Sequence, residues 1–266
     1  MSAAAAASQH HSPLYWTVAD AVAVTRRNLL RYVRVPTLLL FSTIQPVMFV
    51  LLFVYVFGGE IRIPGIAYVD YLMPGIFVQT VVFGSTQTGV GLAEDLSRGM
   101  IDRFRSLPMA RSAVLAGRTL SDTVRNLFVV LLMTVVGTLV GFRFHAGLLA
   151  TLAAIVLAVL FGLAFSWIAA FIGLSVRDVE SAQAAGFVWV FPLVFASSSF
   201  VRVESMPGWL QGFARANPIT NTVNALRALC LGGPTTRPLL YSLAWILGIL
   251  LVFVPLAVRR YRRAAG

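Results

Sequence analysis

The stretch LLATLAAIVLAVLFGLAFSWIAAFIG, residues Leu148–Gly173, contains no charged residue. A helix that spans a membrane needs about 20 mostly apolar residues, so this segment predicts a transmembrane helix. Similar uncharged runs occur on both sides of it. They are Val35–Gly59, Tyr71–Ala93, Asn126–Phe142, Ser181–Val201 and Pro238–Val258. We therefore predict six transmembrane helices, near residues 37–58, 71–93, 118–142, 148–173, 181–201 and 238–258.

The composition agrees with a chain that lies in the membrane. Hydrophobic residues make up 58% of the 266 positions, charged residues 12%, and the mean hydropathy is +0.84. A soluble domain has roughly 25% charged residues. The predicted fold class is an all-α polytopic membrane protein. Residues 1–16 are predicted to be a disordered tail, residues 17–258 a single transmembrane domain, and residues 259–266 a basic tail.

The basic residues predict the orientation of the chain. All 21 are arginine. Most of them flank the predicted spans at one side, in the N-terminal segment, in the Glu94–Arg125 loop, at Arg177 and in the C-terminal tail. Because arginine accumulates in cytoplasmic loops, both termini are predicted to be cytoplasmic. The fifth loop, Arg202–Arg237, is the exception, since it has four arginines on the predicted outer side.

The absence of lysine from the sequence excludes a P-loop, whose lysine contacts the nucleotide phosphates. One cysteine, Cys230, permits neither an internal disulfide nor a cysteine-based zinc site. No Asp, Glu, Lys or Arg lies inside the six uncharged runs, which argues against a proton-driven carrier. The chain is therefore not predicted to be an enzyme, and any ATP would be hydrolysed by another protein.

Two segments before the third span have helical patterns. In Thr17–Arg34, apolar residues and arginines occupy different faces, which predicts a basic amphipathic helix in the inner interface. In Glu94–Leu107, apolar residues recur every four positions and oppositely charged residues lie three or four apart. This second segment reads either as a docking surface for a cytosolic partner or as a solvated loop helix. The helix that follows is predicted to carry Arg118, Asp122 and Arg125 below the membrane.

The predicted outer segment Val201–Gly233 is too apolar for a simple loop. Asn217 and Pro218 are typical of a helix N-cap and of the first helical position. We predict two short amphipathic helices, one before and one after Asn217, that either re-enter the membrane as a cap or rest on lipid. The residues singled out here are Trp209, Phe213, Asn217, Pro218 and Arg227.

The polar residues inside the spans are neutral. Gln45 lies in the first span, and Gln79 and Thr86 lie on one face of the second. Phe187, Phe191 and Phe195 form a stripe on the fifth. These residues either line a transport pathway or a dimer face, or they form ordinary contacts between helices and with lipid.

Four motifs together resemble those of ABC type-2 transporter permeases, most closely the daunorubicin-resistance branch of multidrug exporters. They are YLMPGIFVQT at Tyr71–Thr80, SRGMIDRFRSLPMARSAVLAGRTLSD at Ser97–Asp122, GFRFHAG at Gly141–Gly147 and MPGWLQGFARANPITNTVNALRALCLGG at Met206–Gly233. The chain departs from the family at Glu94-Asp95-Leu96-Ser97-Arg98, where Glu-Arg-Glu is frequent.

The resemblance implies a permease that dimerises and binds two copies of a separate ATPase, which would hold the ATP and magnesium. It implies that Glu94–Leu107 is the coupling helix and that Arg177–Ser181 is a second inner contact. The coupling residues expected on this basis are Glu94, Asp95, Arg98, Met100, Asp102, Arg103, Phe104, Arg105, Arg177, Asp178 and Glu180. It also implies outer re-entrant helices before the last span.

The expected function is export of a hydrophobic or amphiphilic drug, lipid or polyketide-like molecule across the cytoplasmic membrane of a bacterium, powered by the partner ATPase. Two alternatives remain open at this point. One is export of a lipid-linked glycan, and the other is a membrane scaffold or a secondary carrier without ATP coupling. Neighbouring genes for an ATPase or for glycan synthesis would discriminate among the three.

Overall fold

The computed structural model describes residues 13–34, 36–58, 63, 65–99 and 111–264, and every regular element among them is helical. The long helices are α1 (Pro13–Arg34), α2 (Pro36–Leu51), α3 (Tyr68–Ser97), α5 (Arg111–Val140), α6 (Leu148–Gly173), α7 (Val179–Phe195) and α10 (Thr236–Ala264). The short elements are the π-helix η1 (Leu52–Phe57), which continues α2, the 3-10 helix η2 (Val203–Ser205), and the helices α8 (Gly208–Ala216) and α9 (Pro218–Leu231).

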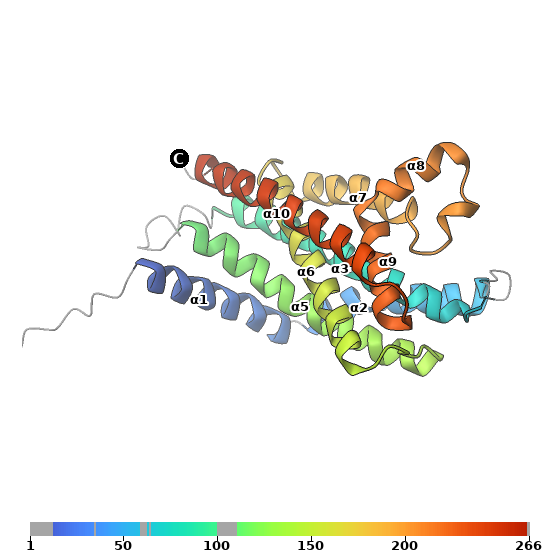
Figure 1. Ribbon diagram of the computed structural model, residues 1–266. Helices are drawn as coiled ribbons and strands as arrows, with labels where there is room; N and C mark the ends of the chain where they lie inside the picture. Colours follow the sequence, from blue (N-terminus) through green and yellow to red (C-terminus); the bar gives the residue numbers. More distant parts are fainter. Residues whose placement is uncertain (1–12, 35, 59–62, 64, 100–110, 265–266) are drawn as a thin grey trace, which may run out of the picture.

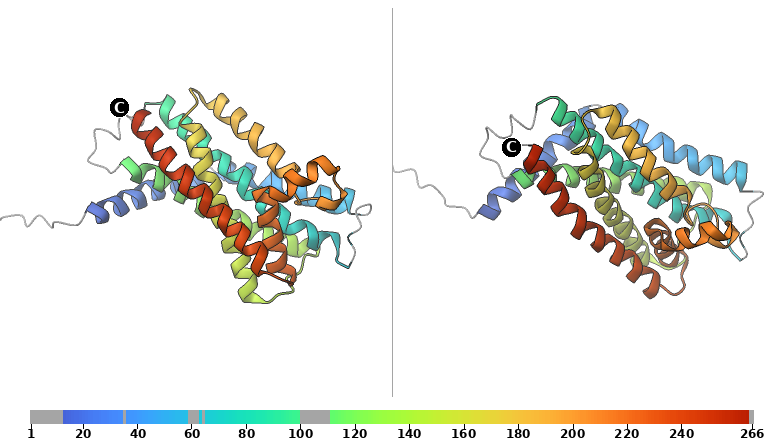
Figure 2. Two further views of the ribbon diagram at one scale, coloured as in Figure 1. Left: turned by 45° about the horizontal axis from the view of Figure 1, so that its top comes forward. Right: turned by 90° about the horizontal axis from the view of Figure 1, so that it is seen from above.

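Helices α3, α5, α6, α7 and α10 run lengthwise in an elongated bundle, and α1 lies in the half that contains the C-terminal end of α10 (Figures 1 and 2). One end contains the C-terminus, the end of α3, the start of α5 and the turn between α6 and α7. The opposite end contains the loop between α5 and α6 together with α8 and α9.

Among the described residues, three helical segments are long and apolar enough to cross a membrane: Leu115–Val140, Leu148–Gly173 and Thr236–Arg263. Thr43–Val56 and Val179–Phe195 are shorter apolar helices. Helix α3 has 30 residues, but Gln79, Thr80, Gln87 and other polar residues lower its hydropathy. It remains a prediction that α2 with η1, α3 and α7 also span the membrane. It is likewise a prediction that both termini lie on the cytoplasmic side.

Helix α1 confirms the predicted N-terminal helix, although it begins at Pro13 rather than at residue 17. Proline is favoured at the start of a helix because its missing N–H needs no partner there. The buried face of α1 contains Val24 and Thr25, and the Thr25 hydroxyl donates to Gly117 O of α5 at 3.1 Å. Val22, predicted to be part of the apolar stripe, is exposed. This helix therefore packs on α5 and leaves an apolar edge uncovered.

The predicted start of a separate helix at Glu94 is wrong, because Glu94 belongs to α3. Residues 94–97 form the last turn of α3, which ends at Ser97. Arg98 is the C-cap residue, and Gly99 follows it with φ 63°. Glycine adopts this left-handed conformation without steric cost and commonly ends a helix. Glu94 and Arg98 are one of the oppositely charged pairs four positions apart, and they form an ion pair in which Arg98 Nη2 lies 2.7 Å from Glu94 Oε1. Residues 100–107 lie outside the described residues.

The fifth predicted span, 181–201, is too long at its end. Helix α7 stops at Phe195, and Ser197–Ser199 form a buried turn. The Ser199 N–H donates to Ser197 Oγ at 3.2 Å, and the Ser198 N–H donates to Thr220 Oγ1 at 3.1 Å. Hydroxyl groups that accept hydrogen bonds from backbone N–H groups offer the chain an alternative to the helix.

The last helix is longer than predicted. Helix α10 continues to Ala264, so the described part of the predicted basic tail is helical.

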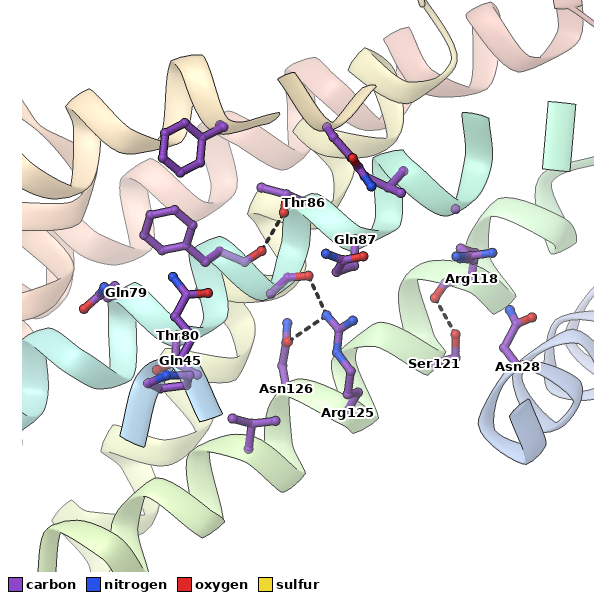
Figure 3. Close-up of a pocket in the computed structure, with 18 of the residues that line it drawn as sticks. Asn28, Gln45, Gln79, Thr80, Thr86, Gln87, Arg118, Ser121, Arg125 and Asn126 are labelled. Carbon is purple, nitrogen blue, oxygen red and sulfur yellow. Dashed lines mark hydrogen bonds between the residues drawn. The ribbon is translucent and has the colours of Figure 1, made fainter. Parts of the chain in front are cut away.

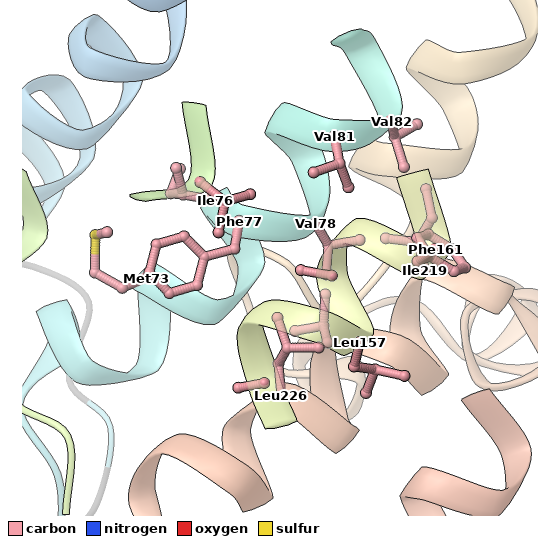
Figure 4. Close-up of a cluster of buried hydrophobic side chains, with 14 of the residues drawn as sticks. Met73, Ile76, Phe77, Val78, Val81, Val82, Leu157, Phe161, Ile219 and Leu226 are labelled. Atoms are coloured by element: carbon pink, nitrogen blue, oxygen red, sulfur yellow. The ribbon is translucent and has the colours of Figure 1, made fainter. Parts of the chain in front are cut away.

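The largest hydrophobic core lies where α3, α6 and α9 meet (Figure 4). Phe77 and Val78 of α3, Phe161 of α6, and Ile219 and Leu226 of α9 are all buried in it. Lipid tails are as apolar as these side chains, so association of helices in a membrane depends on close packing rather than on removal from water. Small residues allow that packing, and Gly89 of α3 lies against Gly173 of α6.

We expect Gly173→Ala to separate α3 from α6. A Cβ atom at residue 173 would lie 2.2 Å from the carbonyl oxygen of Gly89, which is backbone and cannot rotate away. Overpacking of this kind costs about 1–3 kcal/mol. The melting temperature of the purified protein in detergent measures the effect. Gly248→Ala on α10 is the matched control, because nothing lies within 4 Å of its added Cβ; equal melting temperatures for the two variants would contradict the prediction.

Candidate functional site: a polar cavity along helix α3

A cavity of about 450 Å³ lies between α1, α2, α3, α5 and α7 (Figure 3). Helix α3 supplies one face of it through residues spaced three or four apart, among them Gln79, Phe83, Thr86, Val90 and Glu94. The other lining residues are Asn28, Gln45, Pro46, Thr80, Gly84, Gln87, Gly91, Arg118, Ser121, Arg125, Asn126, Val129, Gln183 and Phe187. The wall is thus mixed, with amides and hydroxyls beside aromatic and aliphatic carbon.

The predicted pathway residues fall into two groups. The structure brings Gln45, Gln79, Thr86 and Phe187 together as lining residues of this cavity. Phe191 and Phe195 extend the stripe along α7 beyond it, with ring centroids 5.1 Å apart for Phe187–Phe191 and 4.2 Å apart for Phe191–Phe195. The stripe is therefore continuous, and only its first ring faces the cavity.

The charged end of the cavity contains a buried ionic network that the sequence analysis missed. Asp122 of α5 is 1% exposed and accepts a hydrogen bond from the Thr88 hydroxyl of α3 at 2.6 Å. Its other oxygen lies 3.7 Å from Arg125 Nη1, and Arg118 Nε lies 3.9 Å from the oxygen that Thr88 contacts. Asp122 and Arg125 were predicted to lie below the membrane. They follow Arg118 by four and seven positions, and this spacing indicates that the three side chains share one face of α5.

The network also holds α5 to the last turns of α3. Arg118 Nη1 is 3.2 Å from Asp95 Oδ2, and Arg125 Nη2 donates to the carbonyl oxygen of Gly84 at 2.5 Å and to Asn126 Oδ1 at 3.2 Å. A guanidinium presents several donors in one plane, so it can bind a carboxylate and a carbonyl together. The cavity wall is in this way connected to the segment that follows Ser97.

The predicted coupling residues are only partly described. Glu94, Asp95 and Arg98 lie at the end of α3, where Glu94 also lines the cavity. Met100, Asp102, Arg103, Phe104 and Arg105 lie outside the described residues. The coupling role of all these residues remains a prediction.

The turn between α6 and α7, the predicted second inner contact, is set by a cap. Asp178 accepts hydrogen bonds from the Ser181 N–H at 2.7 Å and from the Ser181 hydroxyl at 3.0 Å, which begins α7. These hydrogen bonds hold the pKa of Asp178 below its usual value of 3.8. Arg177 and Glu180 are exposed beside it. The turn therefore offers charged side chains at the same end of the bundle as the end of α3 (Figure 1).

The segment predicted to be outer confirms the two expected helices, α8 and α9. Asn217 caps α9, accepting from the Ile219 N–H at 2.9 Å, and Pro218 is at the first helical position. Helix α9 is buried against α3, α6 and α10, so it does not merely rest on lipid. Helix α8, in contrast, exposes Trp209 and Phe213.

Arg227 of α9 joins three parts of this end. Its guanidinium lies over the Tyr71 ring, with Cζ 3.5 Å from the centroid. Nε donates to Tyr71 O at 3.0 Å, Nη1 to Ser198 Oγ at 3.2 Å and to Asn224 Oδ1 at 3.3 Å, and Nη2 to Ser198 O at 2.5 Å and to Ser199 O at 3.3 Å. All five N–H donors of the side chain thus have an acceptor, and none of the acceptors is a carboxylate. We call Arg227 and these acceptors the Arg227 clamp.

The family model described as ABC-2 type transporter matches residues 20–231. The chain belongs to this family. It is 36% identical over 238 residues to a daunorubicin resistance ABC transporter permease of Streptomyces coeruleorubidus, covering 89% of this chain and 83% of the relative.

Two further relatives extend the comparison. A probable doxorubicin resistance ABC transporter permease of Mycobacterium tuberculosis is 30% identical over 266 residues, covering 97% of this chain and 93% of the relative. A putative transport permease of Cyanophora paradoxa is 25% identical over 221 residues, covering 81% and 75%. The predicted resemblance is therefore confirmed: the protein is an ABC-2 permease similar to membrane subunits named for drug resistance.

Proposed function

We propose that this permease moves amphiphilic molecules outward across the cytoplasmic membrane of a bacterium, and that a separate ATPase subunit supplies the energy. The cavity along α3 is the observation that carries the proposal. It combines polar and aromatic wall residues, and the Asp122 network connects it to the end of α3. The relatives named for resistance to daunorubicin and doxorubicin support an amphiphilic substrate.

The coupling surface in this proposal consists of the end of α3, the segment after it and the Arg177–Ser181 turn. The end of α3 and the Arg177–Ser181 turn lie at one end of the bundle, together with the end of α10 (Figure 1). The complex would contain two permeases and two ATPase subunits, with ATP and magnesium held by the ATPase. Arg118 would transmit movement of the α3 end to the cavity wall, because it contacts both Asp95 and Asp122.

Both termini would be cytoplasmic in this arrangement, and α8 and α9 would lie at the outer end as re-entrant helices. A second permease copy would cover exposed apolar residues of α7, among them Phe187, Val188 and Phe191. The permease itself would not hydrolyse ATP, because its sequence lacks the lysine of a P-loop.

We expect inverted membrane vesicles that contain the permease and its ATPase to accumulate doxorubicin only when ATP is present. Vesicles with the permease alone, or with an ATPase whose P-loop lysine is replaced, are the controls and should show neither accumulation nor ATP hydrolysis. Fluorescence of the trapped drug and release of phosphate are the two measurements. ATP-independent accumulation, or hydrolysis by the permease alone, would contradict the proposal.

A further inference from the structure

Two buried polar atoms of α3 that belong to cavity-lining residues have no hydrogen-bond partner among the described residues. They are Gln79 Oε1 and Thr80 Oγ1, on side chains that are 3% and 8% exposed. A buried polar atom without a partner is destabilising, and native proteins contain few of them. Such atoms in a cavity wall indicate that something else binds there.

The neighbouring hydroxyls of α3 show that the lack of a partner at Thr80 is specific to its position. Ser85 donates to Val82 O at 2.6 Å, Thr86 donates to Phe83 O at 2.7 Å, and Thr88 donates to Asp122. A helical Ser or Thr hydroxyl commonly bonds to a carbonyl of the preceding turn in this way. The Thr80 hydroxyl makes no such hydrogen bond. Figure 3 shows Thr80 with Gln79 and Gln45 at one end of the cavity, away from the charged residues.

The charged residues at the other end are balanced. Glu94 pairs with Arg98, Arg118 pairs with Asp95, and Arg125 pairs with Asp122. The charged side chains described in the cavity wall are thus matched by opposite charges of the same chain. A charged ligand group would lose its hydration on entry without gaining an uncompensated partner, which is costly.

We propose that the Gln79–Thr80 end of the cavity is a subsite for an uncharged hydroxyl group of the exported molecule. Gln79 Oε1 accepts a hydrogen bond from the ligand hydroxyl, and the Thr80 hydroxyl donates a hydrogen bond to the oxygen of the same ligand group. The apolar body of the ligand packs against Phe83, Val129 and Phe187, which line the same cavity. This inference rests on the proposed function, because it specifies which part of an amphiphile the cavity recognises.

Three pyrene probes that differ in one group test the subsite on the purified permease: 1-pyrenemethanol, 1-pyrenemethylamine and 1-methylpyrene. Fluorescence titration in one detergent measures each dissociation constant. We expect the alcohol to bind about tenfold more tightly than the methyl compound, as two added neutral hydrogen bonds provide. The charged amine should bind no more tightly than the methyl compound.

The variant Gln79→Met removes the proposed acceptor and Thr80→Val removes the proposed donor, each with little change in shape. Each should reduce the preference for the alcohol about three- to fivefold, and the double variant should abolish it. Thr134→Val on α5 is the matched control, because its hydroxyl bonds to Val130 O and it does not line the cavity. Subtracting the signal of the double variant removes partition of the probes into detergent.

Thermal stability separates ligand recognition from a structural role. Thr80→Val removes a buried hydroxyl without a partner, so the melting temperature should stay the same or rise while the preference is lost. A structural role would lower it. The proposal is overturned if the alcohol shows no saturable binding, if all three probes bind equally, if the amine binds most tightly, or if the double variant keeps the preference. Since this assay needs no ATPase, its result is independent of the export assay.

Discussion

Asp122→Ala is expected to destabilise the permease by about 3–5 kcal/mol, the cost of removing one partner from a buried ion pair. Asp122 is almost completely buried and contacts Arg118, Arg125 and Thr88. Its removal leaves two guanidinium groups in a low-dielectric environment with one carboxylate fewer. A lower melting temperature in detergent and a lower yield of folded protein are the measurements.

Glu204→Ala is the matched control for this variant. Glu204 also pairs with an arginine, Arg202, at 3.5 Å, but their side chains are 64% and 48% exposed. An exposed ion pair contributes about 0–1 kcal/mol, so this variant should melt close to the wild type. The double variant Asp122→Leu/Arg125→Met should recover part of the lost stability, because it removes both charges of the pair and does not leave Arg125 buried without Asp122. Similar melting temperatures for Asp122→Ala and Glu204→Ala would show that the network does not stabilise the bundle.

Arg227→Lys is the second substitution with a large expected effect, about 2–4 kcal/mol. Lysine has three donors on one nitrogen, so it cannot reach acceptors on α3, on the 197–199 turn and on α9 simultaneously. The buried carbonyl oxygens of Ser198 and Ser199 would lose a charged donor, and each such hydrogen bond contributes about 1.5–3 kcal/mol. The stacking on Tyr71 would also weaken.

Hydrogen exchange measures this effect where it occurs. Backbone amides of the 196–200 turn and of α9 should exchange faster in Arg227→Lys than in the wild type, because local opening becomes easier. Arg215→Lys on α8 is the control, since the Arg215 side chain donates a solvent-exposed hydrogen bond to Gln211 Oε1 at 3.1 Å. Unchanged exchange at the turn would mean that the Arg227 clamp does not hold it.

Several parts of the fold could be predicted from local sequence because a local interaction decides them. Leu148–Gly173 has the predicted bounds, since a glycine precedes it and apolar residues fill it. Asn217 and Pro218 begin α9 as expected, because a cap depends on atoms two or three residues apart. The same holds for the Glu94–Arg98 pair within one helical turn.

The errors arose where a distant segment competes with a local preference. The uncharged segment 196–199 was predicted to be part of a membrane span. The side chains of Thr220, Asn217 and Arg227 hydrogen-bond to its backbone at Ala196 and Ser198 and make it a turn. The burial of Asp122 and Arg125 was not predicted. Nothing nearby in the sequence indicates that Thr88 of α3 contacts Asp122 or that Gly84 of α3 contacts Arg125. Burial of these charges depends on how α3 and α5 pack.

By itself the sequence determined the class of the protein: apolar runs of membrane length, arginine between them, and no lysine for a nucleotide site. Each of these properties follows from the composition of stretches of sequence, without knowledge of which distant residues are in contact. The tertiary structure alone decided which polar residues share one cavity, that Asp122 is buried beside it, and that Arg227 holds three segments together. Those outcomes depend on contacts between residues up to 156 positions apart, and local propensity contains no information about such contacts.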